Sequence, residues 1–411
     1  MHDRTRNFLC RLGFLAFCVG PTVGLLVWAV VIRTSPHQSA LRENWQRRLS
    51  QYSGTTVTVG QVSHPNLQVT RLQNLALKDM ESGAQIANIR VLEIWKKKDS
   101  WIFHAPLPVE AYTQHLQGVW KSLQERVMRG GVSEAPFYFA ADTITLQRED
   151  GVQWTLRDLG CRLNSSPHQA QATLYFHDVQ ANADRPSQLT ITRQRQASPP
   201  QTHWELRTND YSFPCGLLAD FQPSLRRLGE DAAFRGTWEA VETDLGWEGY
   251  LTGRLSEIEL QGLTSHLRTE YRLSGKAELT LNRGRLQDGI LTDAAGELQA
   301  QRGVVSEAML AWSKQTLGLS PLMPVGDSRE PWEYERMHLG FQLEGGRFLR
   351  IEGKCLQDQR GVVMVDSRNR PLVADSMQTV EMADFPKASP LSPPLKPASL
   401  RTPPAPGVRL H

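Results

Sequence analysis

Apolar and polar residues alternate with a period of two along most of this 411-residue chain, from residue 55 to residue 366. A period of two places successive side chains on opposite faces of a strand, whereas a helix needs a period near 3.6. The run TVTVGQV, for example, places Val57 and Val59 on one face. The alternation therefore predicts a mainly β protein.

Strand-like runs recur along the chain and are separated by turn clusters such as NRGR, EGGR and DSRNRP. Short strands with connections that contain Gly, Asn and Pro are typical of antiparallel sheets. We therefore expect a curled or elongated antiparallel β-sheet. Its later strands are predicted at residues 137–149, 152–164, 169–177, 189–194, 203–208, 234–241, 249–260, 271–282, 296–305, 338–343, 348–352 and 362–366.

Few helices are expected, and each should cover the sheet or one of its open edges. The clearest candidate spans residues 108–128, where apolar residues recur at helical spacing and Gly130 and Gly131 follow. Shorter candidates are residues 40–52, 215–228 and 307–317. The first of these carries Trp and Arg residues that suit either a membrane surface or ordinary packing.

Residues 12–32 form an uncharged run of 21 residues, preceded by Arg4, Arg6 and Arg11. At 1.5 Å per residue the run extends about 32 Å, enough to cross a hydrocarbon core of roughly 30 Å. A short basic tail, here residues 1–11, stays cytoplasmic. We expect one transmembrane helix in the inner (cytoplasmic) membrane, with the bulk of the chain in the periplasm. The alternative is a cleaved signal peptide, but its apolar core would be about 7 to 15 residues and no small-x-small cleavage site follows.

The rest of the chain is expected to divide into three parts. Residues 33–130 form a first β region that includes the helix at 108–128, and residues 131–383 form a β-rich body. Residues 384–411 contain eight prolines in 28 residues, a composition that favours an extended, disordered tail.

The sequence offers no motif for a reaction, a metal site or a cofactor. It contains no GxSxG, SxxK, HExxH, P-loop or GxGxxG signature. The balance of 46 basic and 43 acidic residues is too even for a nucleic-acid binder. Cys161, Cys215 and Cys355 lie beyond the apolar run, and they form either one disulfide at most or three buried thiols. We expect a protein without catalytic residues.

The N-terminal part resembles the AsmA-like family of bacterial envelope proteins. The resemblance depends on a helix that ends near Leu49 and Gly54, a valine-rich strand at 57–60, and strands at 72–79 and 86–94. A later stretch, residues 273–306, looks like the Gly-bounded β repeats of the same family. The resemblance implies outer-membrane biogenesis or lipid handling, with no catalytic residues to carry over.

The resemblance also implies an apolar β groove that shields lipid acyl chains, each buried methylene contributing roughly 0.8 kcal/mol. The strand at residues 86–95 is apolar on both faces and is the expected lining. The candidate lining residues are Ile86, Ile89, Val91, Leu92, Ile94 and Trp95. The same pattern also fits a strand packed between a sheet and the helix at 108–128.

Nine tryptophans outside the apolar run are further candidates, some for a groove and most for the core. They are Trp95, Trp101, Trp120, Trp154, Trp204, Trp238, Trp247, Trp312 and Trp332.

The membrane is thus one expected partner, and phospholipid and other envelope proteins are further ones. The alternative function is a scaffold that binds cell wall or partner proteins through its body and its basic, Pro-rich tail.

Overall fold

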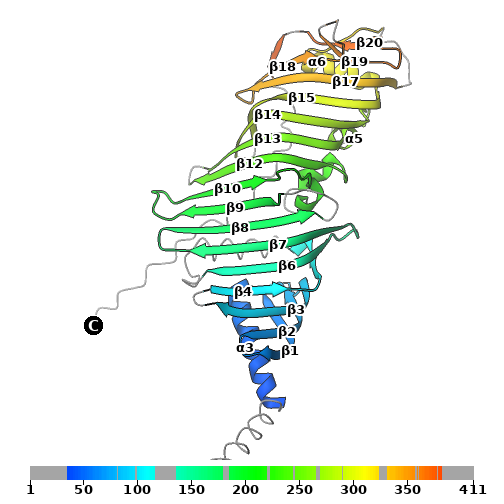
Figure 1. The fold of residues 1–411 in the computed structure, drawn as a ribbon. Helices are drawn as coiled ribbons and strands as arrows, with labels where there is room; N and C mark the ends of the chain where they lie inside the picture. Colours follow the sequence, from blue (N-terminus) through cyan, green and yellow to red (C-terminus); the bar gives the residue numbers. More distant parts are fainter. Residues whose placement is uncertain are drawn as a thin grey trace, which may run out of the picture. The chain divides into compact units, whose positions relative to one another are not determined.

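The described residues of the chain form a mainly β protein with a large antiparallel sheet and few helices, as predicted (Figure 1). The structure, a computed structural model, describes residues 35–80, 82–97, 100–115, 136–178, 185–219, 223–243, 246–264, 269–288, 290–323, 331–356, 359, 361–376 and 378–381. Within these ranges no helix is both long and apolar enough to cross a membrane. The span expected at 12–32 and the tail at 384–411 lie outside them.

The chain forms two compact units, one of residues 1–126 with 137–153 and the other of residues 127–136 with 154–411. The division expected at residue 130 falls among residues 116–135, which the structure does not describe.

The described residues of the first unit form one helix and six strands. They are α3 (Ser35–Ser53), β1 (Thr56–Asn66), β2 (Val69–Lys78), β3 (Gln85–Lys97), β4 (Ser100–Ala105), β5 (Val109–Tyr112) and β6 (Phe137–Gln147). Strands β1, β2 and β3 form an antiparallel meander.

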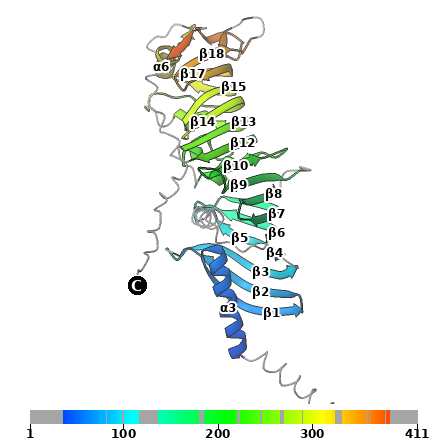
Figure 2. The same cartoon turned by 90° about the vertical axis from the view of Figure 1, so that its left-hand side faces the viewer.

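Helix α3, predicted at residues 40–52, packs against β1 (Figure 2). Ser50 Oγ accepts a hydrogen bond from the Val57 amide at 2.9 Å, which ties the end of the helix to the start of the strand. Trp45 meets Trp101 of β4 edge to face, with ring centroids 6.5 Å apart. This helix therefore has a packing role within the unit.

Strands β4 and β5 share one position in the sheet, between β3 and β6. Both are antiparallel to β3 and parallel to β6. Pro106 and Pro108 separate them, because proline cannot donate a ladder hydrogen bond.

The helix predicted over 108–128 is therefore wrong at its start. Val109 and Ala111 are buried in a strand, and helical backbone is described only at residues 113–115. Over so few residues the apolar spacing fits both a helix and a strand. Hydrogen bonding to β3 on one side and β6 on the other therefore decides that the segment is a strand.

The second unit is built on a ladder of consecutive antiparallel strands. In ladder order these are β7 (Gln153–Ser165), β8 (Gln169–Asp178), β9 (Ser187–Gln194), β10 (Gln201–Arg207), β12 (Ala233–Thr243), β13 (Gly246–Glu259), β14 (Lys276–Gln287), β15 (Ile290–Val305), β17 (Trp332–Glu344) and β18 (Phe348–Gly353). Short strands complete it: β11 (Phe213–Pro214), β16 (Ser320–Pro321), β19 (Val362–Val365), β20 (Pro371–Ala374) and β21 (Thr379–Glu381).

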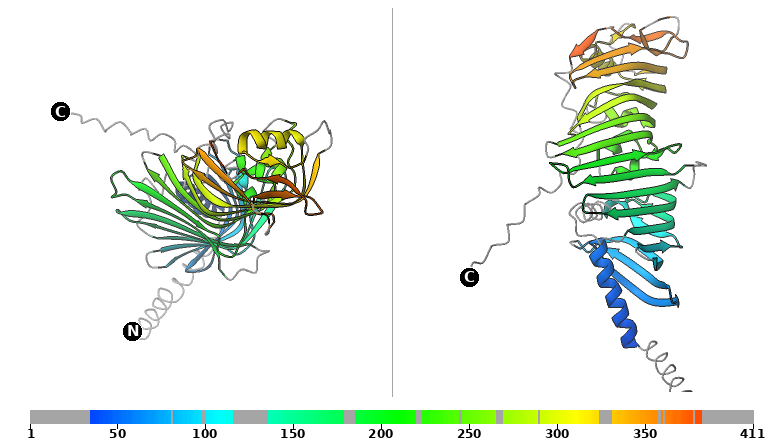
Figure 3. Two further views of the ribbon diagram at one scale, coloured as in Figure 1. Left: turned by 90° about the horizontal axis from the view of Figure 1, so that it is seen from above. Right: turned by 60° about the vertical axis from the view of Figure 1, so that its left-hand side comes forward.

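Short helices lie against one face of this ladder (Figure 3). They are η2 (Cys215–Leu218), η3 (Pro223–Leu228), α5 (Leu260–Thr264) and α6 (Glu307–Leu317). Helix α6 has the predicted bounds, since Ser306 caps its start and Gly318, in the left-handed conformation, ends it. The continuous helix predicted at 215–228 is instead two 3-10 helices, and the second begins at Pro223.

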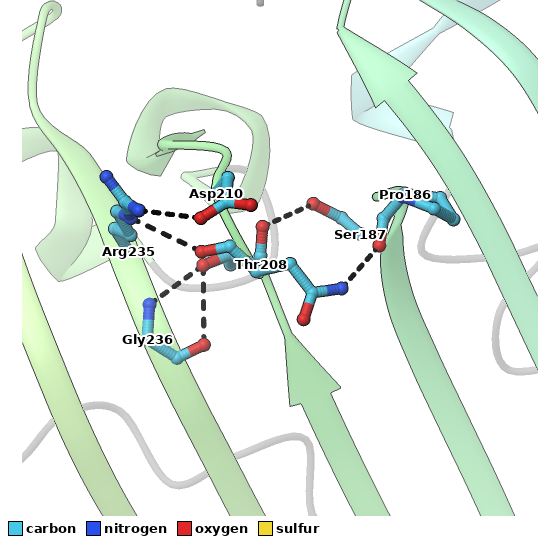
Figure 4. A network of polar contacts seen from close by, with 7 residues as sticks. Pro186, Ser187, Thr208, Asp210, Arg235 and Gly236 are labelled. Carbon is cyan, nitrogen blue, oxygen red and sulfur yellow. Dashed lines mark hydrogen bonds and ion pairs between the residues drawn. The ribbon is translucent and has the colours of Figure 1, made fainter. Parts of the chain in front are cut away.

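A buried polar network lies where β10 ends (Figure 4). Thr208 is fully buried; its hydroxyl donates to the Gly236 carbonyl at 3.3 Å and accepts from the Gly236 amide at 2.8 Å. Ser187 Oγ donates to the Thr208 carbonyl at 3.2 Å. Side-chain hydroxyls thus satisfy backbone groups at the point where the β10–β12 ladder stops.

Cys161, Cys215 and Cys355 are free thiols, as in the second of the two alternatives, but only Cys215 and Cys355 are buried, and Cys161 is half-buried. Burial raises the pKa of Cys161 to about 11 and the pKa of Cys215 to about 11. Burial also raises the pKa of Cys355.

Alkylation should therefore be slow in the folded protein. A thiol with a pKa of about 11, well above its ordinary value, carries roughly 100-fold less thiolate at pH 8 than an exposed thiol does. We expect iodoacetamide at pH 8 to label the peptides of Cys161 and Cys215 about 100-fold more slowly in native protein than in guanidinium, as followed by mass spectrometry. Equal rates in the two conditions, or a disulfide between any two of these cysteines, would contradict the structure.

Candidate apolar binding face

The two faces of the ladder in the second unit differ sharply in chemistry. Strand β13 shows the pattern: Trp247, Gly249, Leu251 and Leu255 project on one side, and alternate with Glu248, Tyr250, Thr252 and Arg254 on the other. Residues directly opposite each other on paired strands share a face, so the register extends this pattern across the sheet.

The side that carries Leu251 is called here the apolar face. Its residues form cross-strand rows that register defines. The first row consists of Ala172, Ile191, Trp204, Ala240, Gly249, Leu286 and Leu291. The second consists of Leu174, Leu189, Leu206, Trp238, Leu251, Gly284, Ala294, Leu343 and Leu349. The third consists of Phe176, Ser187, Gly236, Gly253, Leu281, Gly296, Phe341 and Ile351, and the fourth of Phe234, Leu255, Leu279, Leu298, Leu339 and Gly353.

The opposite face is covered with charged and polar side chains that pair across strands. Arg254 contacts Glu278, and Lys354 Nζ lies 2.6 Å from Glu297. Arg285 and Tyr250 both donate to Glu248 and lower the pKa of its carboxyl group. Such pairs contribute little to stability when exposed, but they identify this face as the solvated one.

One flank of the apolar face is covered by the short helices. Met309 and Leu310 of α6 and Leu260 of α5 are buried in one cluster with Met337. The fourth row packs against this cluster through Leu255, Leu279, Leu298 and Leu339. The burial of this flank is the ordinary core of the unit.

The first two rows approach the other flank, and many of their large side chains are only half-buried. These are Leu174, Leu189, Trp238, Leu251, Leu286, Leu291, Leu343 and Leu349. Trp247 is half-buried beside them and stacks at a tilt on Trp204, with ring centroids 5.8 Å apart. Apolar side chains on consecutive strands, incompletely covered by the described residues, form a surface suited to an apolar ligand.

A polar cluster borders this open flank, at the ends of β9, β10 and β12. Arg193, Thr202 and Glu242 lie directly opposite one another on these strands, and Trp247 is opposite Glu242. Arg193 Nη1 donates to Thr202 Oγ1 at 2.9 Å, and Thr202 in turn is hydrogen-bonded to Glu242. Burial raises the pKa of Glu242, although the charge of Arg193 and the bond to Thr202 oppose that rise.

The six residues expected to line a lipid groove lie on β3 of the first unit. Ile86, Ile89, Leu92 and Ile94 are 1 to 6% exposed, and Val91 and Trp95 are half-buried. They are divided between the two faces of the strand, because the buried positions shift by one residue between Ile89 and Leu92.

The same shift occurs between Val59 and Val62 on β1 and between Leu72 and Leu75 on β2. Asn74, with φ of 54°, lies at this level of the sheet. The structure thus places four of the six expected lining residues in the core of the first unit.

The apolar face of the second unit carries a sequence signal of its own. In the run GWEGYLTGRLSEIE every second residue from Trp247 to Leu255 is apolar or glycine, and the residues between them are polar or charged. Trp204, Trp238 and Trp247 were among the tryptophans considered for a groove, and all three lie on this face. Sequence reasoning did not identify Arg193, Thr202 and Glu242, because only strand register brings them together.

Comparison of the chain with protein-family models, with curated proteins and with solved structures finds no match. The described ranges contain no group of three or more His, Cys, Asp or Glu residues that could hold a metal ion.

Proposed function

We propose that this protein is a non-enzymatic envelope protein that binds lipid acyl chains on the apolar face of its second unit. Residues 12–32 would anchor it in the inner membrane, with the β-rich body in the periplasm. The observation that supports the proposal best is the set of half-buried Leu and Trp side chains on the first two rows of that face, which is interrupted on β10 by the buried Trp204 and Leu206. The resemblance of the N-terminal part to AsmA-like proteins agrees with it.

The physical argument concerns what such a surface gains from a ligand. The half-buried Leu and Trp side chains of these rows keep part of their apolar area in contact with water. An acyl chain laid along the rows would remove that area from water and contribute roughly 0.8 kcal/mol per buried methylene, less the cost of ordering the chain.

Changing Leu286 to Asp should remove the bound lipid. Leu286 is half-buried in the first row, so a carboxylate there would have to be desolvated beneath an acyl chain. We expect the full-length variant, purified in a maltoside detergent, to retain roughly one-fifth or less of the lipid that co-purifies with the wild type. Lipid extraction and mass spectrometry measure this amount. Leu291→Asp, in the same row, should behave in the same way.

Thr252→Asp is the matched control, because Thr252 is exposed on the polar face of the neighbouring strand. It adds the same charge and should retain the lipid. Circular dichroism must show the same β content for all variants. Lipid-free wild-type protein, or equal lipid in Leu286→Asp and Thr252→Asp, would refute the proposal and favour the scaffold function.

A further inference from the structure

The polar cluster of Arg193, Thr202 and Glu242 is unusual because it lies on the apolar face. Arginines of the second unit such as Arg235, Arg254 and Arg285 lie on the polar face and form ion pairs with carboxylates. Arg193 instead lies next to Ile191 and the fully buried Ala170, and is itself half-buried. Among the described residues its guanidinium donates one hydrogen bond, to Thr202, and has no carboxylate within 4.0 Å.

The geometry separates a positive and a negative group at the border of the apolar rows. Arg193 and Glu242 are on strands separated by β10, so their backbones lie about 10 Å apart at roughly 4.8 Å per strand. Thr202, which is fully buried, lies between them and fixes both side chains through its hydroxyl. Both charged groups retain donor or acceptor capacity for a ligand, because a guanidinium has five N–H donors and a carboxylate about four acceptor positions.

We propose that this cluster binds the headgroup of a zwitterionic amino-phospholipid whose acyl chains lie on the apolar face. Arg193 would donate to the phosphate, and Glu242 would accept from the primary ammonium. This inference depends on the proposed function, and it adds the class of lipid and the direction in which it lies.

Four features support this arrangement. A guanidinium recognises phosphate oxygens through paired N–H donors, so Arg193 is suited to the phosphate. Glu242 is desolvated and is influenced by the charge of Arg193 without a direct ion pair among the described residues, and an ammonium would supply one. Trp247, directly opposite Glu242 on β13, places an indole where an ammonium would gain a cation–π contact. The rows of Leu and Trp begin immediately beside the cluster, so headgroup and chains would both be accommodated.

The test measures the affinity of the full-length, delipidated protein in maltoside micelles for four probes. These are dioleoyl phosphatidylethanolamine, dioleoyl phosphatidylglycerol, dioleoylglycerol and the chain-free glycerophosphoethanolamine. The first three are used with bromine added across the double bonds of their oleoyl chains, so that they quench tryptophan fluorescence on binding, and competition reports the fourth.

The variants are Arg193→Gln and Glu242→Gln. Arg283→Gln and Glu239→Gln are the matched controls, since they make the same charge changes at exposed positions on the polar face. We expect Arg193→Gln to weaken both phospholipids about tenfold and leave dioleoylglycerol unchanged, in line with the loss of charge-assisted hydrogen bonds. Glu242→Gln should weaken phosphatidylethanolamine about fivefold and leave phosphatidylglycerol unchanged. The controls should bind as wild type.

The headgroup site would be overturned if Arg193→Gln bound phosphatidylethanolamine as tightly as the wild type does. It would also be overturned if Arg193→Gln weakened dioleoylglycerol as much as it weakened the two phospholipids. Competition by glycerophosphoethanolamine at the lipid's own concentration would overturn the assignment to a lipid. If wild-type protein binds none of the three brominated probes, the proposed function itself fails.

Discussion

Replacing Gly253 with Ala is expected to lower the free energy of unfolding of the second unit by about 3 kcal/mol or more. Gly253 on β13 lies opposite Gly236 on β12. A Cβ at Gly253 would lie 2.2 Å from the Arg235 carbonyl oxygen and 2.6 Å from the Gly236 Cα. Both contacts are with backbone, so the two strands would have to separate. The φ of 140° at Gly253 adds strain, since L residues rarely adopt it.

Gly345→Ala is the control for this prediction. Gly345 has a φ of 59°, and a Cβ there meets no heavy atom within 4 Å. Its replacement should therefore cost only the left-handed conformation, about 1 to 2 kcal/mol. Guanidinium unfolding followed by circular dichroism measures both variants. Equal losses of unfolding free energy in the two variants would contradict the close backbone contact between β12 and β13.

The glycine pair also bears on the binding face. Gly236 and Gly253 leave the third row without side chains between the Thr208 network and Leu281. Widening the β12–β13 spacing would displace the neighbouring Trp238 and Leu251 of the second row. Gly253→Ala should therefore reduce lipid retention together with stability, whereas Gly345→Ala should affect neither strongly.

The strands of the second unit are largely predictable from sequence, because a half-buried strand shows its alternation directly. The expected strand at 169–177, for instance, is β8 at Gln169–Asp178, and the expected helix at 307–317 is α6. Boundaries are less predictable. Strand β15 begins at Ile290 and not at residue 296, because its first residues pair with the end of β14 although their pattern is weak.

Local pattern fails where a segment's neighbours decide its structure. Residues 109–112 fit a helical stripe, but they form β5 because β3 and β6 present unpaired edges on both sides. The parallel pairing of β4 and β5 with β6 is likewise invisible in the sequence, since it depends on residues more than 30 positions apart.

The candidate site shows the same limit. Strand β3 was predicted to line a groove because it is apolar on both faces. Burial of both faces in a core produces the same pattern. Strand β13, with one apolar and one charged face, has the pattern expected of an exposed binding sheet. The position of Arg193 opposite Thr202 and Glu242 requires the register of three strands, which no single segment encodes.

The second large effect is expected for Leu72→Ala in the first unit. Leu72 is fully buried on β2 and lies directly opposite Val62 on β1 and Leu92 on β3. Removing its side chain leaves a cavity that the surrounding strands cannot fill, and such changes cost about 2 to 5 kcal/mol. Leu67→Ala, in the turn between β1 and β2, is the control, because Leu67 is fully exposed. Its effect should be within about 0.5 kcal/mol.

The pair also tests the role of β3. If Leu92 belongs to the core, the loss in Leu72→Ala should be the same before and after lipid extraction, because Leu72 and Leu92 support each other without a ligand. If β3 instead lines a lipid groove, the loss should shrink when lipid is removed, since the wild type would then lose the same support. Thermal unfolding of lipid-bound and delipidated protein, wild type and variant, distinguishes the two results.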